Sequence, residues 1–290
     1  MDLIAWVNGE FVPLEEARVS ILDRGFLYGD GLFETLYGRG GKIFRLDEHL
    51  DRLSAGAESL KIPLPVSKDK LQALAIETLY RNPLGEAIIK IQLTRGAGSP
   101  GLVFPKETQA SLVIQARPHQ KLPAEWLEQG VAACTANQAP PVIGLLDRQV
   151  KSCNYLLNIL TQNQARETGF FEALYLDADN GLTEGTISNV FVVKDGCVRT
   201  PPVGKQVLNG ITRRVILEIC SAQNIECREE CVSLDSALDA DELFITNSGI
   251  GVLPVTRINY DVLATGSPGP VTRRLAKAYL KTVDGEVGSC

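Results

Sequence analysis

About the first 115 residues of the chain combine stretches in which apolar residues recur with helical spacing and short apolar stretches typical of strands. From Leu46 to Leu60 apolar residues return every three or four positions, which predicts a helix with one buried face. A second helix is predicted from Lys68 to Tyr80. Asn8-Gly9 between apolar flanks indicates a hairpin turn, because both turn residues tolerate positive φ. Strands are predicted at 32–37, 42–45, 87–93 and 111–116. This order predicts a small α/β domain.

The stretch from Arg117 to Pro123 is polar and bracketed by two prolines, which stiffen the chain and remove donors for a strand ladder. We therefore predict a small domain over 1–118, a linker over 119–123 and a larger domain over 124–290. In the larger domain we expect strands at 131–136, 172–177, 187–193 and 242–246, helices at 154–167, 212–222 and 272–282, and a loop through Pro140-Pro141.

Composition narrows the classes of function. The net charge is −6 and Lys and Arg form no run, which disfavours a nucleic-acid or anionic membrane surface. The N-terminus lacks a signal-peptide pattern and no stretch is long enough to cross a membrane, so a cytoplasmic location is expected. The seven cysteines show no CxxC spacing and only two histidines are present, so neither a disulfide framework nor a metal site is expected. Cys227 and Cys231 lie four apart, but the segment 225–232 has the pattern of a strand, which keeps them too far apart for one ion.

Lys151 and Glu184 are the first candidate pair for chemistry. A lysine amine can form a Schiff base with a carbonyl cofactor. A carboxylate facing a pyridine nitrogen keeps that nitrogen protonated, as pyridoxal phosphate (PLP) requires of an electron sink. Taken alone the pair is weak, because the chain has 29 Lys and Arg and 35 Asp and Glu, most of which belong to a solvated surface.

Two segments have the composition of a phosphate site. Gly210, Ile211 and Thr212 begin a predicted helix, and unpaired amides at a helix N-terminus favour an anion. Asn247 and Ser248 end a strand in a small polar turn that can present donors. Each segment also has a simpler interpretation, as a capped helix or an ordinary turn.

Arg52 and Tyr28 are open to two interpretations. Arg52 could clamp a phosphate with its planar donor fork, or pair at the surface with Glu48 four residues earlier. Tyr28 could be a core aromatic, but Gly29 and Gly31 beside it suggest backbone brought close to a ligand or to another strand.

Six motifs occur in the order typical of class IV aminotransferases. They are 24–35 (RGFLYGDGLFET), 44–53 (FRLDEHLDRL), 148–155 around Lys151 (RQVKSCNY), 182–193 around Glu184 (LTEGTISNVFVV), 209–213 (NGITR) and 246–248 (TNS). Over nearly the whole length, from about Val7 to Val255, the chain resembles PLP enzymes of fold type IV. This group holds branched-chain aminotransferases, D-amino acid aminotransferases and 4-amino-4-deoxychorismate lyases.

The resemblance implies an α/β enzyme of two unequal domains with PLP as cofactor. Lys151 would carry the cofactor and move the proton, and Glu184 would pair with the pyridine nitrogen. Tyr155 would lie near the phenolic oxygen of the cofactor. The phosphate would be held by Arg52, Gly210, Ile211, Thr212, Asn247 and Ser248, and the substrate pocket would include Tyr28, Phe33, Gly96 and Ser99. Members of this family are dimers or higher oligomers with sites between the two domains and near the partner subunit, so a homodimer with a small amine or amino-acid substrate is implied.

The reaction itself stays open between an elimination and a transamination. The second phosphate motif, Thr246-Asn247-Ser248, looks more like the lyases than the Gly-Thr-Ala turn of branched-chain enzymes, as do Lys151-Ser152 and Tyr155-Leu156. Branched-chain enzymes also typically show an arginine in the strand where this chain has Lys90. D-amino acid enzymes place an arginine and a histidine in the loop after Ser99-Pro100, and both are missing here. The leading prediction is the lyase, and the alternative is a transaminase of branched-chain, D-amino acid or (R)-amine type. A non-catalytic binding module would be expected to have lost Lys151 or Glu184, and both are present.

Overall fold

The structure, a computed structural model, describes residues 3–136, 150–204 and 206–288. The chain divides into two compact units. The first contains Met1–Gln120, Val150–Asn154 and Val283–Cys290, and the second contains Lys121–Gln149 and Tyr155–Thr282. The sequence pattern placed Val150–Asn154 and Val283–Cys290 with the second unit.

The first unit is a six-stranded sheet with helices on one face. The strands lie in the order β2-β1-β6-β5-β3-β4, and all of their pairings are antiparallel. Their bounds are β1 Ile4–Val7, β2 Glu10–Pro13, β3 Gly31–Arg39, β4 Lys42–Ile43, β5 Glu86–Thr94 and β6 Ser111–Pro118. The helical segments are η1 Leu14–Glu16, α1 Arg24–Tyr28, α2 Leu46–Ser59 and α3 Lys68–Arg81.

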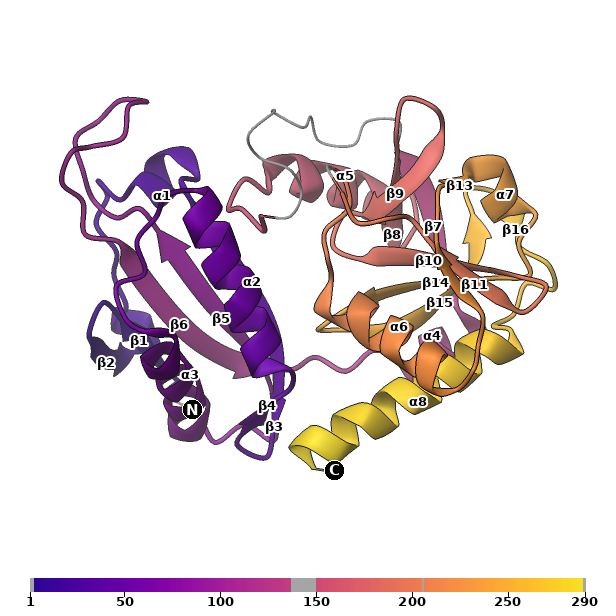
Figure 1. The fold of residues 1–290 in the computed structure, drawn as a ribbon, viewed down its shortest axis with the longest axis horizontal. Coiled ribbons are helices and arrows are strands. Elements are labelled where there is room, and N and C mark those ends of the chain that lie inside the picture. The colour runs from indigo at the N-terminus through magenta and orange to yellow at the C-terminus, as the bar shows by residue number, and fades with distance from the viewer. Residues whose placement is uncertain (1–2, 137–149, 205, 289–290) are drawn as a thin grey trace. The chain divides into compact units, whose positions relative to one another are not determined.

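The core of this unit lies between the sheet and helices α2 and α3, which Figure 1 shows crossing one face of the strands. Alternate residues of the strands, such as Leu36, Ile89 and Ile91, are fully buried against these helices. The residues between them, including Phe33, Lys90 and Gln92, lie on the opposite face and are only partly buried. This second face, which we call the open face, carries polar and aromatic side chains.

The segment Val150–Asn154 joins this unit through backbone hydrogen bonds to β3. The Phe33 amide donates to the carbonyl of Lys151 (2.9 Å), and the Cys153 amide donates to the carbonyl of Gly31 (2.8 Å). Ser152 forms an antiparallel bridge with Leu32. Lys151 is therefore held by the backbone of β3, a long-range pairing that local periodicity does not reveal.

The second unit is built on a ten-stranded sheet. Nine strands follow the order β12-β11-β10-β14-β15-β7-β8-β9-β13, and β16 pairs with β15. The bounds are β7 Val131–Ala136, β8 Glu172–Leu176, β9 Gly181–Gly185, β10 Asn189–Lys194, β11 Cys197–Thr200, β12 Cys227–Glu229, β13 Val232–Ser233, β14 Glu242–Asn247, β15 Gly251–Ile258 and β16 Asp261–Val262.

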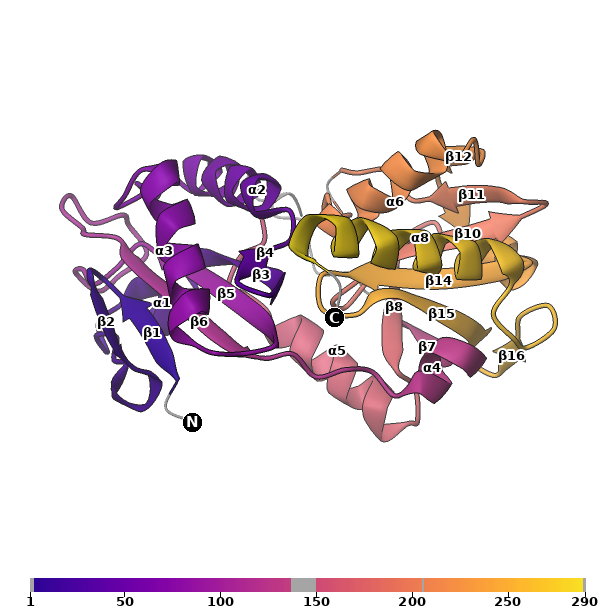
Figure 2. The ribbon, with the colours of Figure 1, turned by 90° about the horizontal axis from the view of Figure 1, so that it is seen from below.

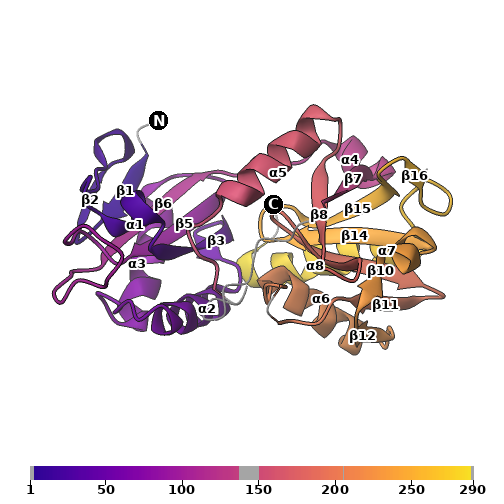
Figure 3. The same ribbon diagram turned by 90° about the horizontal axis from the view of Figure 1, so that it is seen from above.

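Helices lie on both sides of this sheet. They are α4 Ala124–Gln129, α5 Leu156–Glu167, α6 Ile211–Ala222, α7 Leu234–Leu238 and α8 Pro270–Val287, whose last turn belongs to the first unit. Figure 2 shows α6 and α8 together on one side of the strands, and Figure 3 shows α5 on the other, beside β8. The apolar core is formed by alternate residues of the central strands, such as Val190, Ile245 and Leu253.

The long amphipathic elements are confirmed. The hairpin at Asn8-Gly9 and the two helices of the first unit form as predicted, with Asn8 and Gly9 at positive φ. The strand predicted at 225–232 is wrong in part, because it breaks into β12 and β13, which pair with different neighbours. The strand predicted at 42–45 ends at Ile43, since Arg45 turns into a left-handed conformation before α2. The loop predicted through Pro140-Pro141 lies outside the described residues.

Candidate active site

Lys151 projects its amine over an aromatic ring on the open face of the first unit. The amine nitrogen lies 4.9 Å from the centre of the Phe33 ring, and the Lys90 amine lies 4.6 Å from the same centre. Burial lowers the pKa of the Lys90 ammonium, and the charges of Arg117 and Lys151 lower it further. The predicted nucleophile and the predicted pocket residue Phe33 are therefore in contact, with a second amine that the sequence reasoning did not assign.

Arg52 is held by a buried carboxylate, Glu34 of β3. Its Nε and Nη2 atoms donate to the two oxygens of Glu34, each at 2.7 Å, and His49 Nδ1 lies 2.7 Å from Oε2. The alternative pairing of Arg52 with Glu48 is not what the structure shows, because Glu48 pairs with Arg45. Burial alone would raise the pKa of the Glu34 carboxyl, but the charge and hydrogen bonds of Arg52, with a smaller effect of His49, lower it to about 2.

Tyr28, the last residue of α1, contacts the loop of the first unit that contains Gly96 and Ser99. The Tyr28 hydroxyl accepts a hydrogen bond from the Gly101 amide (3.0 Å), so Tyr28 anchors the loop that follows Gly96. Gly96 has φ +84°, and a Cβ there would lie 1.8 Å from the carbonyl oxygen of Gln109, so no other residue fits without a shift. Ser99 is exposed at the surface of this loop.

Glu184 of β9 lies at an irregularity in the sheet of the second unit. Leu174 pairs with Gly185 and Leu176 pairs with Leu182, so β9 has one residue more than β8 between these pairs, as in a β-bulge. Bulges re-aim side chains beside functional sites. The Glu184 carboxylate is buried and accepts a hydrogen bond from the Leu208 amide (2.7 Å). The bulge thus directs Glu184 toward the segment that precedes α6.

The two predicted phosphate segments meet in the second unit through Asn189 of β10. The Asn189 amide group donates to the carbonyl of Leu208 (2.9 Å), just before Gly210, and Asn189 pairs with Thr246 across β10 and β14. Gly210 is the N-cap of α6 and has no side chain to cap the first-turn amides of Ile211 and Thr212. The structure therefore brings the N-terminus of α6 beside the end of β14, as the sequence reasoning required but could not show.

Asn247 and Ser248 form the turn that follows β14. The Asn247 side chain accepts from the amides of Gly249 (2.8 Å) and Ile250 (2.9 Å) and donates to the carbonyl of Ile187 (3.2 Å). Its side chain is therefore used in shaping the turn that presents Ser248. Tyr155 is the residue before α5 and belongs to the second unit.

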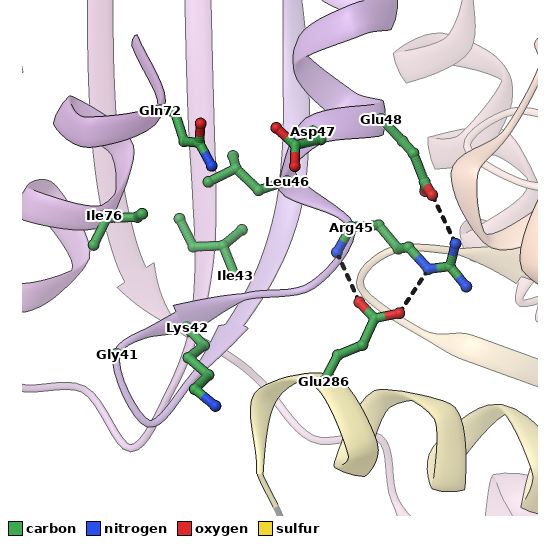
Figure 4. A pocket seen from close by; sticks show the side chains of 10 residues that line it. All are labelled: Gly41, Lys42, Ile43, Arg45, Leu46, Asp47, Glu48, Gln72, Ile76 and Glu286. Carbon is green, nitrogen blue, oxygen red and sulfur yellow. Dashed lines mark hydrogen bonds and ion pairs between the residues drawn. The ribbon is translucent and has the colours of Figure 1, made fainter. Parts of the chain in front are cut away.

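A separate surface pocket of about 500 Å³ lies in the first unit, and none of the predicted site residues lines it. Figure 4 shows Arg45 at its edge, where the Arg45 amide and guanidinium both bond to Glu286 and the guanidinium also reaches Glu48. Of the acids that line this pocket, Glu48 and Glu286 pair with Arg45, and Asp47 lies in the first turn of α2. We therefore assign this pocket no part in the proposed chemistry.

Comparison with known proteins identifies the family. Residues 31–258 match the model of the family described as amino-transferase class IV. The chain is 38% identical over 274 residues to a putative branched-chain-amino-acid aminotransferase of Methanocaldococcus jannaschii, covering 94% of both chains. It is 35% identical to the D-alanine aminotransferase of Staphylococcus epidermidis, covering 96% of this chain and 97% of the relative. The chain belongs to the class IV aminotransferases.

A solved structure adds the cofactor. A branched-chain amino acid aminotransferase solved with pyridoxamine 5'-phosphate has a TM-score of 0.92 at 30% identity, covering 99% of this chain and 95% of that one. This class IV aminotransferase is therefore a PLP enzyme of fold type IV, as predicted. The lyase that the motifs favoured gains no support from these relatives, which are aminotransferases.

Residues of the second unit of this class IV aminotransferase fit the phosphate of PLP. The first-turn amides of α6 are left uncapped by Gly210, and a Cβ at that position would lie 2.0 Å from Asn189 Oδ1. The Thr246 hydroxyl is buried and has no hydrogen-bond partner within the described part of the chain. An uncapped helix N-terminus beside an unsatisfied hydroxyl matches the needs of an anion.

Three residues of this aminotransferase were missed from the sequence. Glu34 alternates along β3 with the core residues Leu32 and Leu36, so the alternation could have predicted a buried carboxylate. A buried carboxylate requires a cationic partner. Lys90 was noted only as a departure from an arginine. Asn189 gave no local signal, because its role comes from the pairing of β10 with β14 and from the return of the chain at Leu208.

No helix within the described residues is both long and apolar enough to cross a membrane.

Proposed function

We propose that this protein transfers amino groups between amino acids and keto acids and that its principal donors are L-amino acids with branched apolar side chains. The observation that carries the proposal is the pair of amines over Phe33. Lys151 lies 4.9 Å and Lys90 4.6 Å from the centre of one ring. A nucleophilic amine, a cation and an apolar surface stand together there, as an apolar amino acid requires.

Lys90 is suited to hold the carboxylate of the substrate. Among the described residues no acid pairs with its amine, and its pKa is lowered by burial. A partly buried cation without a partner gains from a bound anion, because the anion replaces lost hydration. Lys90 lies on the open face between Ile88 and Gln92, opposite Thr35 and diagonal to Phe33, whose own partner is Gln92.

The remaining roles are those that the resemblance to class IV aminotransferases implies. When bound, PLP supplies the electron sink for charge that develops at the amine-bearing carbon. Lys151 would hold the cofactor covalently and move the proton at that carbon. Glu184 would face the pyridine nitrogen, and Tyr155 would lie near the phenolic oxygen. The phosphate would be held by Arg52, Gly210, Ile211, Thr212, Asn247 and Ser248.

The loop after Ser99 supports branched apolar substrates over D-alanine. Its residues Leu102, Val103 and Phe104 are apolar and exposed, where D-amino acid enzymes place an arginine and a histidine. Related branched-chain aminotransferases have been solved with norvaline and with 4-methylvaleric acid. Together with the relative that is 38% identical, these complexes support a pocket for aliphatic side chains.

We also propose that the enzyme is a homodimer. Leu156, Ile159 and Leu160 form an exposed apolar stripe on α5, and Phe26, Leu102 and Val103 are exposed in the first unit, with Leu102 86% exposed. Large exposed apolar groups mark interaction surfaces. Sedimentation equilibrium should give twice the mass of the chain, and an active monomer would contradict this assembly.

The test of the reaction is a set of parallel turnover assays on the holoenzyme. Amino transfer to 2-oxoglutarate is measured from L-leucine, L-valine and D-alanine, and release of 4-aminobenzoate and pyruvate is measured from aminodeoxychorismate. Lys151→Ala is the inactive control. We expect the L-branched donors to exceed D-alanine by at least about tenfold in kcat/KM, a difference of about 1.4 kcal/mol.

Two outcomes would overturn the proposal. Faster transfer from D-alanine would assign the enzyme to the second family branch represented among its relatives. Release of 4-aminobenzoate without transamination would restore the lyase.

A further inference from the structure

A second buried glutamate, Glu172, lies behind the turn that follows Glu184. It begins β8, and none of its surface is exposed. Its Oε1 lies 3.1 Å from the amide nitrogens of both Thr186 and Ala173, and its Oε2 accepts from the Ser188 hydroxyl (3.0 Å). The hydroxyl of Thr186 also contacts Oε1. Glu172 thus binds the turn residues two and four places after Glu184.

The hydrogen bonds of the Thr186 hydroxyl determine the protonation state of Glu172. The Thr186 hydroxyl oxygen contacts both Glu172 Oε1 and Gln162 Oε1, the latter at 2.8 Å. Both are acceptor oxygens, and a hydroxyl has one proton to give. The orientation of Gln162 is fixed, because its Nε2 donates to the carbonyl of Phe171 (2.8 Å), and the reversed amide would set two acceptors against each other.

One arrangement gives every polar group in this series of hydrogen bonds a partner. The protonated Oε1 of Glu172 donates to the Thr186 hydroxyl oxygen, the Thr186 hydroxyl donates to Gln162, and Gln162 donates to Phe171. The Ala173 amide donates to the remaining lone pair of Oε1 (3.1 Å), and the Thr186 amide donates to the carbonyl of Ala173 (3.1 Å). An ionised Glu172 would leave either Thr186 or Gln162 facing an acceptor without a proton. Buried polar groups that lack a partner are costly, so the complete chain is favoured.

The surroundings of Glu172 agree with a neutral acid. Burial raises the pKa of its carboxyl, against the hydrogen bonds of Thr186 and Ser188. The titratable groups that sense its charge are Arg166 of α5 and Cys134 of β7. Within the described residues Arg166 makes no ion pair with Glu172, and its guanidinium lies over the Phe171 ring at 4.1 Å.

We infer that Glu172 is a carboxylic acid that keeps its proton at neutral pH and acts as a positioning residue for Glu184. This inference rests on the proposed role of Glu184 as partner of the pyridine nitrogen. The bulge fixes the chain before Glu184, where the Thr183 hydroxyl donates to the carbonyl of Tyr175 (3.1 Å). Glu172 fixes the chain after it, and a neutral acid does so without a second negative charge beside the carboxylate that must face the cofactor.

Gly185 shows how closely the acid is packed into this turn. A Cβ on Gly185 would lie 2.3 Å from the Ser188 hydroxyl and 3.0 Å from the carboxyl carbon of Glu172. Asn158 of α5 holds the same turn by donating to the carbonyl of Thr186, and Asn247 holds it through Ile187. The turn after Glu184 is therefore connected both to α5 and to the proposed phosphate segment, with Glu172 beneath it.

The protonation claim is tested by infrared difference spectroscopy of the holoenzyme at neutral pH. Wild type minus Glu172→Gln should show the C=O stretch of a protonated carboxyl. The matched control, Glu167→Gln at the exposed end of α5, should show no such band. A difference spectrum with only carboxylate bands for Glu172 would overturn the claim, whatever the enzyme catalyses.

The positioning claim is tested by the cofactor dissociation constant and the absorbance spectrum of the bound cofactor. Glu172→Gln keeps a neutral group that can donate to Thr186 and accept from Ser188, and only the Ala173 amide loses its acceptor. The dissociation constant should therefore stay within about threefold of wild type and the spectrum should be unchanged. Glu172→Leu removes these partners and should weaken cofactor binding at least about tenfold and shift the spectrum.

Each other outcome contradicts the inference. If Glu172→Leu lowers thermal stability but leaves the dissociation constant and spectrum of the folded protein unchanged, Glu172 is merely structural. If Glu172→Gln is as damaging as Glu172→Leu, the site needs a charged carboxylate. If instead the proposed function is wrong, the infrared spectrum should still show the C=O stretch of protonated Glu172. Cofactor binding should then not depend on Lys151 or Glu184.

Discussion

Glu34 in the first unit and Glu172 in the second are both almost completely buried, yet their surroundings favour opposite charge states. Glu34 faces the guanidinium of Arg52 and the ring of His49, and its pKa falls to about 2. Glu172 receives only hydroxyl and amide donors, and burial raises its pKa. Burial alone therefore does not set the charge of an acid, because the partners on its oxygens decide between an ion pair and a neutral carboxylic acid.

The two charge states suit two different structural roles. An ionised Glu34 holds Arg52 in a two-pronged ion pair, which directs a fixed cation. A neutral Glu172 fixes a backbone turn and adds no charge. Replacing each acid by its amide should separate these roles.

The largest expected effect is on stability. Glu34→Gln leaves the guanidinium of Arg52 without its counter-charge and should lower the free energy of unfolding by about 3 kcal/mol. Glu172→Gln should lower it much less, because the amide replaces a neutral group and only the Ala173 amide loses its acceptor. Chemical denaturation of the two holoenzyme variants at neutral pH measures the difference, and equal losses would remove the contrast between the acids.

The dependence of stability on pH should differ in sign. For Glu34 the folded-state pKa lies below its usual 4.5, so its contribution is present above that value and is lost as the pH falls toward about 2. For Glu172 the folded-state pKa is raised, so wild type loses stability relative to Glu172→Gln as the pH rises above the usual range of a glutamate. The second difference should grow by about 1.4 kcal/mol per pH unit.

Melting temperatures of wild type and both variants from strongly acidic pH, about 2, up to neutral pH provide the measurement. A difference between wild type and Glu172→Gln that stays constant over this range would show that Glu172 ionises as an ordinary acid.

The smallest effects should come from single neutral partners of Glu172. Thr186→Val removes the middle of the hydrogen-bond chain and should cost about 1–2 kcal/mol, and Ser188→Ala should cost about 1 kcal/mol or less. Thermal unfolding of the two variants can rank them. A cost for Ser188→Ala as large as that of Glu34→Gln would indicate a charged acceptor instead.

The parts of the fold that could be predicted from the sequence are those that depend on contacts between residues close together in the chain. The amphipathic spacing of 46–60 and 68–80 predicted α2 and α3 because that signal lies within one element. The β12 and β13 strands could not be separated, since their break depends on two different partners. The short α1 was also missed, because its glycines suggested a close backbone approach instead.

The candidate site shows the same division. Lys151, Glu184 and the segments at 210–212 and 247–248 could be proposed from residue type and order. Their supports could not: the Glu34 pairing with Arg52 joins β3 to α2, Asn189 reaches Leu208, and Glu172 reaches Thr186 through the β8 and β9 pair. The groups proposed to react are visible in local motifs, and the groups that hold them can be identified only in the folded chain.

The most direct test of the account concerns which amine holds the cofactor. Lys151 and Lys90 lie over the same ring of Phe33, at 4.9 and 4.6 Å from its centre. The holoenzyme is reduced with borohydride, digested, and mapped by tandem mass spectrometry for the lysine that retains the pyridoxyl group. We expect the group on Lys151 alone and its loss in Lys151→Ala. A pyridoxyl group on Lys90, or none on either lysine, would contradict it.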